Sequence, residues 1–128
     1  MKVIIAGGRD IDDPDLLEEA LDDFPYEITE VVCGLAPGVD LLGKSWAKRN
    51  DIPVVEFPAE WDRYGKLAGP IRNRKMAKYA DVLLLIWNGL SPGSANMSKE
   101  MIKERKPAVR YLLSELYGRI NKEISSKG

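Results

Sequence analysis

Four glycine-containing stretches hold the residue types that could bind a ligand. They are Gly7-Gly8-Arg9-Asp10, Cys33–Asp40 (CGLAPGVD), Gly69–Met76 (GPIRNRKM) and Asn88–Ser94 (NGLSPGS). Glycine lets a backbone approach a ligand closely, and successive N–H groups can hold an anion. Arginine adds a bidentate donor for a phosphate or carboxylate. These stretches therefore favour the binding of a phosphorylated ligand.

Eleven residues of these stretches are predicted to contact that ligand. They are Gly7, Gly8, Arg9, Gly34, Gly38, Asp40, Arg72, Asn73, Asn88, Gly93 and Ser94. The first stretch does not match G-x-G-x-x-G, so it is no dinucleotide fingerprint. Asp40 has two interpretations: it stabilises a helix dipole, or it accepts a hydrogen bond from a ribose or base. Trp61, Tyr64 and Trp87 could stack on a base or belong to the core.

Cations are concentrated around the third stretch. Residues 63–78 hold six bases and no acid, residues 10–30 hold ten acids and no base, and the formal net charge is −1. Cations near a helix start oppose the helix dipole, so we interpret Arg72 as a ligand contact and Arg74 as exposed or paired with acids. The alternative is a solvated basic helix face. The net negative charge of the chain argues against a nucleic-acid partner. A module that binds nucleic acid or protein through residues 63–78 is nevertheless one of three functional hypotheses.

The composition excludes several mechanisms. The chain has no histidine and a single cysteine, Cys33, so a zinc site, a Ser-His-Asp triad and an internal disulfide are not expected. We interpret Cys33 as a buried strand residue and predict no metal and no cofactor. If the chain is an enzyme, Asp10, Asp40 and Glu60 are weak candidates for a general base or nucleophile. The lack of a long apolar run predicts a cytoplasmic protein without a membrane span.

Apolar runs and amphipathic segments alternate along the chain and must position these stretches. Strands are predicted at about 2–6, 29–33, 53–57, 81–87 and 107–110, and helices at about 14–24, 39–49, 70–79 and 92–106. The expected fold is a doubly wound, Rossmann-like α/β domain with a mainly parallel five-stranded sheet in the order 3-2-1-4-5. Helices cover both faces, and ligands bind at the carboxyl ends of such strands.

The tail is expected to be a separate helical element. Residues 1–110 form the predicted domain, and residues 111–128 carry apolar side chains at helical spacing. The tail helix packs either on its own domain or on a partner subunit, so a homodimer is a possible assembly.

Several motifs of residues 1–110 together resemble the YspA-like branch of the SLOG superfamily of Rossmann-like domains, which includes DprA/SMF proteins and LOG phosphoribohydrolases. They are Gly7–Asp10, Cys33-Gly34 with Gly38 and Asp40, Phe57–Trp61, Tyr64–Lys66, Gly69–Arg74 with Met76, Ala80-Asp81 and Gly93-Ser94. The resemblance implies a nucleotide-like ligand at the strand ends. LOG enzymes carry a glutamate in P-G-G-x-G-T-x-x-E, and Met97 stands at that position here, with Glu100 three residues later.

The other two functional hypotheses concern a small ligand. The first is the binding or sensing of a nucleotide or nucleotide-derived phosphorylated ligand. The alternative is a hydrolase that cleaves an N-glycosidic or phosphoester bond of such a ligand, although the LOG glutamate is replaced by Met97.

Overall fold

A five-stranded parallel sheet organises the chain. The computed structural model describes residues 1–127, with side chains to residue 125. The strands are β1 (Lys2–Gly7), β2 (Glu30–Cys33), β3 (Val54–Glu56), β4 (Val82–Trp87) and β5 (Ala108–Leu112). Their order is β3-β2-β1-β4-β5, and every pair is parallel. The predicted Rossmann-like α/β fold and strand order are confirmed.

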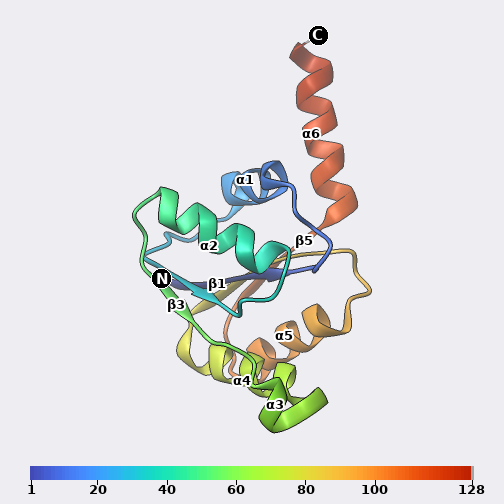
Figure 1. The fold of residues 1–128 in the computed structure, drawn as a ribbon. Coiled ribbons are helices and arrows are strands. Elements are labelled where there is room, and N and C mark those ends of the chain that lie inside the picture. Colours follow the sequence, from blue (N-terminus) through green and yellow to red (C-terminus); the bar gives the residue numbers. More distant parts are fainter. Residues whose placement is uncertain (128) are drawn as a thin grey trace.

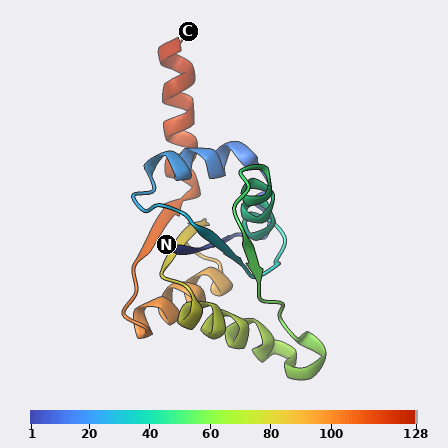
Figure 2. The same cartoon turned by 90° about the vertical axis from the view of Figure 1, so that its left-hand side faces the viewer.

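Helices cover both faces of this sheet. One layer holds α1 (Pro14–Asp23), α2 (Val39–Arg49) and α6 (Leu113–Lys127), and the other holds α4 (Ala68–Tyr79) and α5 (Pro92–Lys103). A one-turn helix, α3 (Trp61–Tyr64), and a 3₁₀ turn (Gly65–Leu67) lead into α4. Figure 1 shows α1 and α2 on one side of the sheet and α4 and α5 on the other, and Figure 2 shows the same layers from the side.

The two faces of the sheet explain why its strands read as continuous apolar runs. In β1, Val3 and Ile5 face the α1/α2/α6 layer, while Ile4 and Ala6 face the α4/α5 layer. A central parallel strand is buried on both faces, so it does not alternate with polar residues. The same reason accounts for β4, in which residues 82–86 are all buried.

The helix starts follow capping chemistry. Asp13 caps α1 by accepting the N–H of Asp15 at 3.0 Å, and Pro14 is the first helical residue, as predicted. The predicted start of the third long helix at Pro70 is wrong by two residues, because α4 begins at Ala68 directly after the 3₁₀ turn. Proline costs little there, since the first-turn N–H groups have no helical partner. Arg72 is thus further inside the helix than predicted, and opposes its dipole less.

The last strand ends later than predicted. Strand β5 continues to Leu112, two residues past the expected end at 110, and α6 then begins at once. Leu116 of α6 is fully buried in the core between the sheet and the α1/α2/α6 layer. Arg119 of α6 pairs with Asp23 of α1 at 3.6 Å (Nη1 to Oδ1). The far end of α6 extends away from the sheet and helices (Figures 1 and 2). The base of the tail therefore packs on its own chain, while the homodimer stays a prediction.

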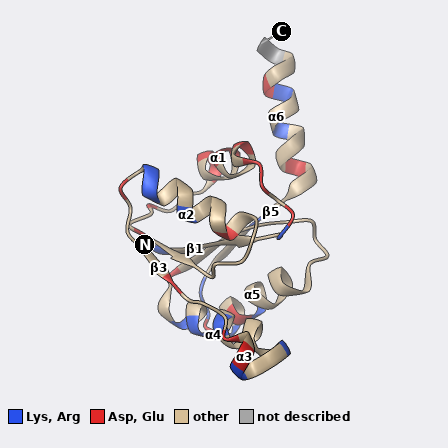
Figure 3. Ribbon diagram, in the orientation of Figure 1, with Lys and Arg blue, Asp and Glu red and all other residues tan. Residues whose placement is uncertain are grey.

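Charge is divided between the layers. Most acids of residues 10–30 lie on or beside α1, and the cations of residues 63–78 lie around α3 and α4 on the opposite side of the sheet (Figure 3). Lys75 and Lys78 are exposed on α4. In the part of the chain that the structure describes, no helix is both long and apolar enough to cross a membrane.

Candidate functional site

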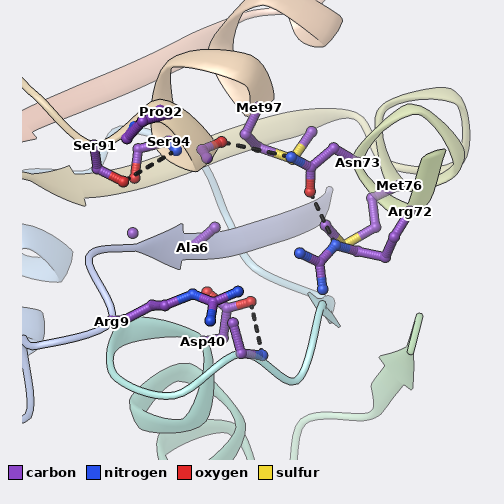
Figure 4. A pocket seen from close by; sticks show the side chains of 13 residues that line it. Ala6, Arg9, Asp40, Arg72, Asn73, Met76, Ser91, Pro92, Ser94 and Met97 are labelled. Carbon is purple, nitrogen blue, oxygen red and sulfur yellow. Dashed lines mark hydrogen bonds between the residues drawn. The ribbon is translucent and has the colours of Figure 1, made fainter. Parts of the chain in front are cut away.

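The four glycine-containing stretches meet around one cavity at the carboxyl end of the sheet. This first cavity measures about 260 Å³. It is lined by Ala6, Gly7 and Arg9 from β1 and its loop, Ala36 from the β2–α2 connection, Asp40 from the first turn of α2, Arg72, Asn73 and Met76 from α4, and Ser91, Pro92, Gly93, Ser94 and Met97 from the first half of α5 and its cap (Figure 4). Seven of the eleven predicted ligand residues thus line one space.

Gly38 joins the first two loops. Its φ of 83° favours glycine, and an added Cβ would collide with the carbonyl oxygen of Gly8. The next residue, Val39, donates its N–H to the same carbonyl at 3.3 Å. Gly38 therefore holds the loop after β2 against the loop after β1, and its contribution to the cavity is the close approach of two backbones.

Arg72 is held in place by hydrogen bonds on both sides of its guanidinium. Nε donates to Oδ1 of Asn73 at 2.9 Å, and Nη1 donates to the carbonyl of Gly34. A Cβ on Gly34 would lie 2.9 Å from Nη1, so the missing side chain makes the room that the guanidinium occupies. Burial lowers the pKa of Arg72, an effect that the negative charge of Asp40 opposes and the positive charge of Arg9 increases.

Asn73 positions other groups rather than presenting a free amide. The side chain is 6% exposed. Its Oδ1 accepts from Arg72, and its Nδ2 donates to Oδ1 of Asn96 at 2.9 Å and to the carbonyl of Gly93 at 3.5 Å. Asn73 therefore fixes Arg72 and connects α4 to the first turn of α5.

Asp40 is a buried acid in the wall of the cavity. It is 4% exposed, and Oδ2 accepts the N–H of Ala36 at 3.4 Å. Burial raises the pKa of Asp40 to about 6, although Arg72, the N–H groups of Ala36 and Gly7, and Arg9 all favour the charged form. A carboxyl group with this pKa can exchange a proton near neutral pH. Within the described residues no group of three or more His, Cys, Asp or Glu side chains could hold a metal ion.

The start of α5 is the second polar wall. Ser91 caps this twelve-residue helix by accepting the N–H of Ser94, and a Cβ added at Gly93 would meet no atom within 4 Å. The hydroxyl of Ser94 is buried and has no hydrogen-bond partner among the residues that the structure describes. Free N–H groups at a helix start attract anions. Ser94, with its unpartnered hydroxyl, lines the same cavity as Arg9 and Arg72, and this combination indicates a place for an anionic group.

Other predicted site residues lie outside the first cavity. Oδ1 of Asn88 accepts the N–H groups of Leu90 and Ser91 at 2.8 and 3.1 Å, so this side chain shapes the loop after β4. Asn88 and Asp10 line an adjoining cavity instead, together with Gly8. Glu60 is exposed before α3 and, among the described residues, lines none of the four cavities of this edge.

Met97 and Glu100 have separate roles on α5. Met97 is 2% exposed and lines the first cavity. Glu100 is turned toward two cations, with Oε2 3.8 Å from Nε of Arg74 and Oε1 3.2 Å from Nζ of Lys103. Arg74 was expected to be exposed or paired with acids, and its side chain is both exposed and paired with Glu100. Glu100 does not line the first cavity, so the helix offers no glutamate there in place of Met97.

The structure separates the three candidate aromatic side chains. Trp61 is 49% exposed and lines two smaller cavities beside Arg9 and Arg72. Trp87 packs against the core between the sheet and the α4/α5 layer, and Tyr64 lies under the guanidinium of Arg63. Only Trp61 of the three is placed to stack on a base near the arginines.

Cys33 and the apolar wall residues complete the site. Cys33 is buried, and burial raises the pKa of its thiol to about 11, so it is an inert strand residue, as interpreted from the sequence. Six residues that line the first cavity are not among the eleven predicted ones: Ala6, Ala36, Met76, Met97, Ser91 and Pro92. The apolar ones among them have no signal that distinguishes a cavity wall from a core position.

Three comparisons with known proteins agree with this architecture. Residues 1–64 match the family model described as YAcAr, the YspA, cpYpsA-related SLOG family. The Gene 61 protein of Mycobacterium phage D29 is 32% identical over 120 residues, covering 86% of this chain and 95% of that protein. The X-ray structure of DNA processing protein A (DprA) from Streptococcus pneumoniae matches with a TM-score of 0.70 at 18% identity, over 98% of this chain. The chain spans 56% of DprA, and that likeness shows the fold alone.

Proposed function

The chain belongs to the YspA, cpYpsA-related SLOG family, and from that premise we propose that it binds or senses a nucleotide or nucleotide-derived phosphorylated ligand. The ligand's phosphate occupies the first cavity, between Arg9 and Arg72 on one side and the start of α5 on the other. Arginine forks and helix N–H groups both match phosphate oxygens.

The base of the ligand lies over Trp61. This indole is half exposed and shares its two cavities with Arg9 and Arg72, so a base stacked there lies beside the arginines that hold the phosphate. An added Cβ on Gly69, at the start of α4, would lie 3.5 Å from the indole ring. The indole therefore lies close to the start of α4.

The observation that carries the proposal is the hydroxyl of Ser94. Ser94 is 4% exposed and lines the first cavity, and its buried hydroxyl has no partner within the described residues. An unsatisfied buried polar group costs roughly 1–3 kcal/mol. A phosphate oxygen in the cavity would accept a hydrogen bond from the Ser94 hydroxyl, so the unpaired group in the free protein would serve ligand binding.

The test is a thermal-shift screen of the full chain against nucleoside mono- and diphosphates, followed by calorimetry on the strongest ligand. A ligand that binds only the folded state raises the melting temperature. Ser94→Ala is expected to weaken binding at least fivefold while leaving the free protein as stable or more stable, because the orphan hydroxyl is removed.

Ser98→Ala is the matched control. Ser98 lies one turn further along α5, is 6% exposed, and its hydroxyl also has no partner among the described side chains, but it does not line the first cavity. It should stabilise the free protein similarly and leave binding unchanged. Equal effects of the two variants on binding, or no ligand in the screen, would contradict the proposal.

One observation favours a second candidate, hydrolysis of the same ligand. Asp40 lies in the cavity wall with a pKa of about 6, which suits a general base. Mass spectrometry of a bound nucleotide after long incubation separates the two: cleaved products that disappear in Asp40→Asn support hydrolysis, and intact ligand supports binding alone.

A further inference from the structure

The first cavity is too small for the whole of a large ligand. Small-molecule sites usually measure roughly 300–1,000 Å³, and the first cavity measures about 260 Å³. A second cavity of about 540 Å³ adjoins it, and Trp61, which lines two other cavities, does not line this one. The room at the strand ends therefore extends in two directions from the arginines.

The two cavities share part of their walls. Arg9, Ser91 and Pro92 line both of them. A phosphate held by Arg9 and the start of α5 in the first cavity consequently has the second cavity directly beside it. Whatever is attached to the far side of that phosphate must enter the second cavity or point into solvent.

The walls of the second cavity are amphipathic. Ile11, Leu90 and Leu113 supply apolar surface, while the carboxylate of Asp10 and the amide of Asn88 add polar groups. A sugar ring matches this combination, because its C–H groups pack on aliphatic side chains while its hydroxyls donate to a carboxylate. A second flat base would find no aromatic platform here, since none of the described residues lining this cavity is aromatic.

The tail contributes to this wall. Leu113 is the first residue of α6, so the end of β5 and the start of the tail place it opposite the loop after β4. That loop is fixed by Asn88, whose Oδ1 accepts the N–H groups of Leu90 and Ser91. Leu90 is 82% exposed on this fixed loop. Its apolar side chain is therefore available to cover a ligand.

We infer that the second cavity holds a hydroxyl-bearing sugar ring joined through a pyrophosphate to the nucleotide, so that the ligand class is a nucleoside diphosphate sugar. This inference rests on the proposed function, because it needs the phosphate in the first cavity. Asp10 then acts as an acceptor for sugar hydroxyls, and Leu90 and Leu113 pack on the ring.

The experiment compares matched pairs of ligands by calorimetry on the full chain. The probes are the four ribonucleoside diphosphates and the corresponding nucleoside diphosphate glucoses. At least one glucose ester is expected to bind tenfold or more tightly than its parent diphosphate. Leu90→Ser and Asp10→Asn should each remove most of that ratio while leaving the affinity for the parent diphosphate within twofold.

Ile102→Ser is the control, because Ile102 is 64% exposed on α5 and does not line the second cavity. Leu113→Ser tests the opposite wall, with its melting temperature checked first because Leu113 packs partly on the core. If diphosphates bind and no glucose ester gains, the inference fails while the proposed function stands. If no member of any pair binds, both fail. A ratio that survives Leu90→Ser and Asp10→Asn also overturns the inference.

Discussion

The two helical layers bury different side chains. Against α1, α2 and α6 the core is aliphatic and aromatic, and Asp40 at the cavity is the only buried charged or polar side chain of those helices among the described residues. The α4/α5 layer buries four polar or charged side chains and three methionines. These are Asn73, Ser94, Ser98, Glu100, Met76, Met97 and Met101.

This difference separates stability from ligand binding. Buried polar groups cost free energy unless they are paired, and methionine packs less specifically than leucine or isoleucine. In the α4/α5 layer, buried polar groups occur where Asn73 fixes Arg72 and where Ser94 lines the cavity. The opposite layer fills its core with leucine, isoleucine and valine. The α4/α5 layer therefore holds much of the site, and the α1/α2/α6 layer holds the larger hydrophobic cluster.

The largest expected effect tests the stability side of this comparison. Leu17→Ala, in the aliphatic layer, should lower the free energy of unfolding by about 4 kcal/mol, because a buried leucine leaves a cavity. Met101→Ala, equally buried in the α4/α5 layer, should cost about 2 kcal/mol, because neighbouring methionines can fill part of the space. Urea denaturation measures both. A larger loss for Met101→Ala would break the comparison.

Asp40 gives the next effect, through pH. Its pKa is about 6 in the fold against 3.8 for a free aspartate. Between those values the folded state keeps a proton that the unfolded state has lost, so stability falls as the pH rises from about 4 to 6. The full penalty, roughly 3 kcal/mol, applies above pH 6.

Asp40→Asn should remove this part of the pH dependence. Urea midpoints of the wild type and the variant are compared between pH 4 and 8, and their difference isolates Asp40 from the other acids. The variant should gain stability relative to the wild type as the pH rises through the window. A difference that stays constant with pH would show that Asp40 is not a strained buried acid.

The smallest effect sharpens the comparison at single helical glycines. An added Cβ meets nothing within 4 Å at either Gly93 of α5 or Gly118 of α6. Alanine at each position should stabilise the free protein by roughly 0.4–1 kcal/mol. Only Gly93→Ala should weaken nucleotide binding in calorimetry, because its methyl group enters the space of the phosphate. Loss of binding in Gly118→Ala as well would argue against a ligand at the start of α5.

The sequence determined the architecture. Continuous apolar runs such as VLLLIW at residues 82–87 require burial on both faces, so alternation with amphipathic segments left a parallel sheet as the consistent fold. Glycine and arginine directly after a strand, as at Gly8 and Arg9, marked the edge at which the site lies. These features are local patterns, and local patterns can be recognised in a single amino-acid sequence.

Tertiary structure decided how individual side chains are used. Three consecutive residues of α4 have different roles. Arg72 is held in the cavity wall, the side chain of Asn73 hydrogen-bonds to it, and Arg74 pairs with Glu100. Their separation depends on where α4 begins and on which helix packs beside it. The pKa of Asp40 likewise depends on burial by distant segments. Composition and spacing fix which groups are present at the site, but burial and partners, which are set by long-range packing, fix what each group can do.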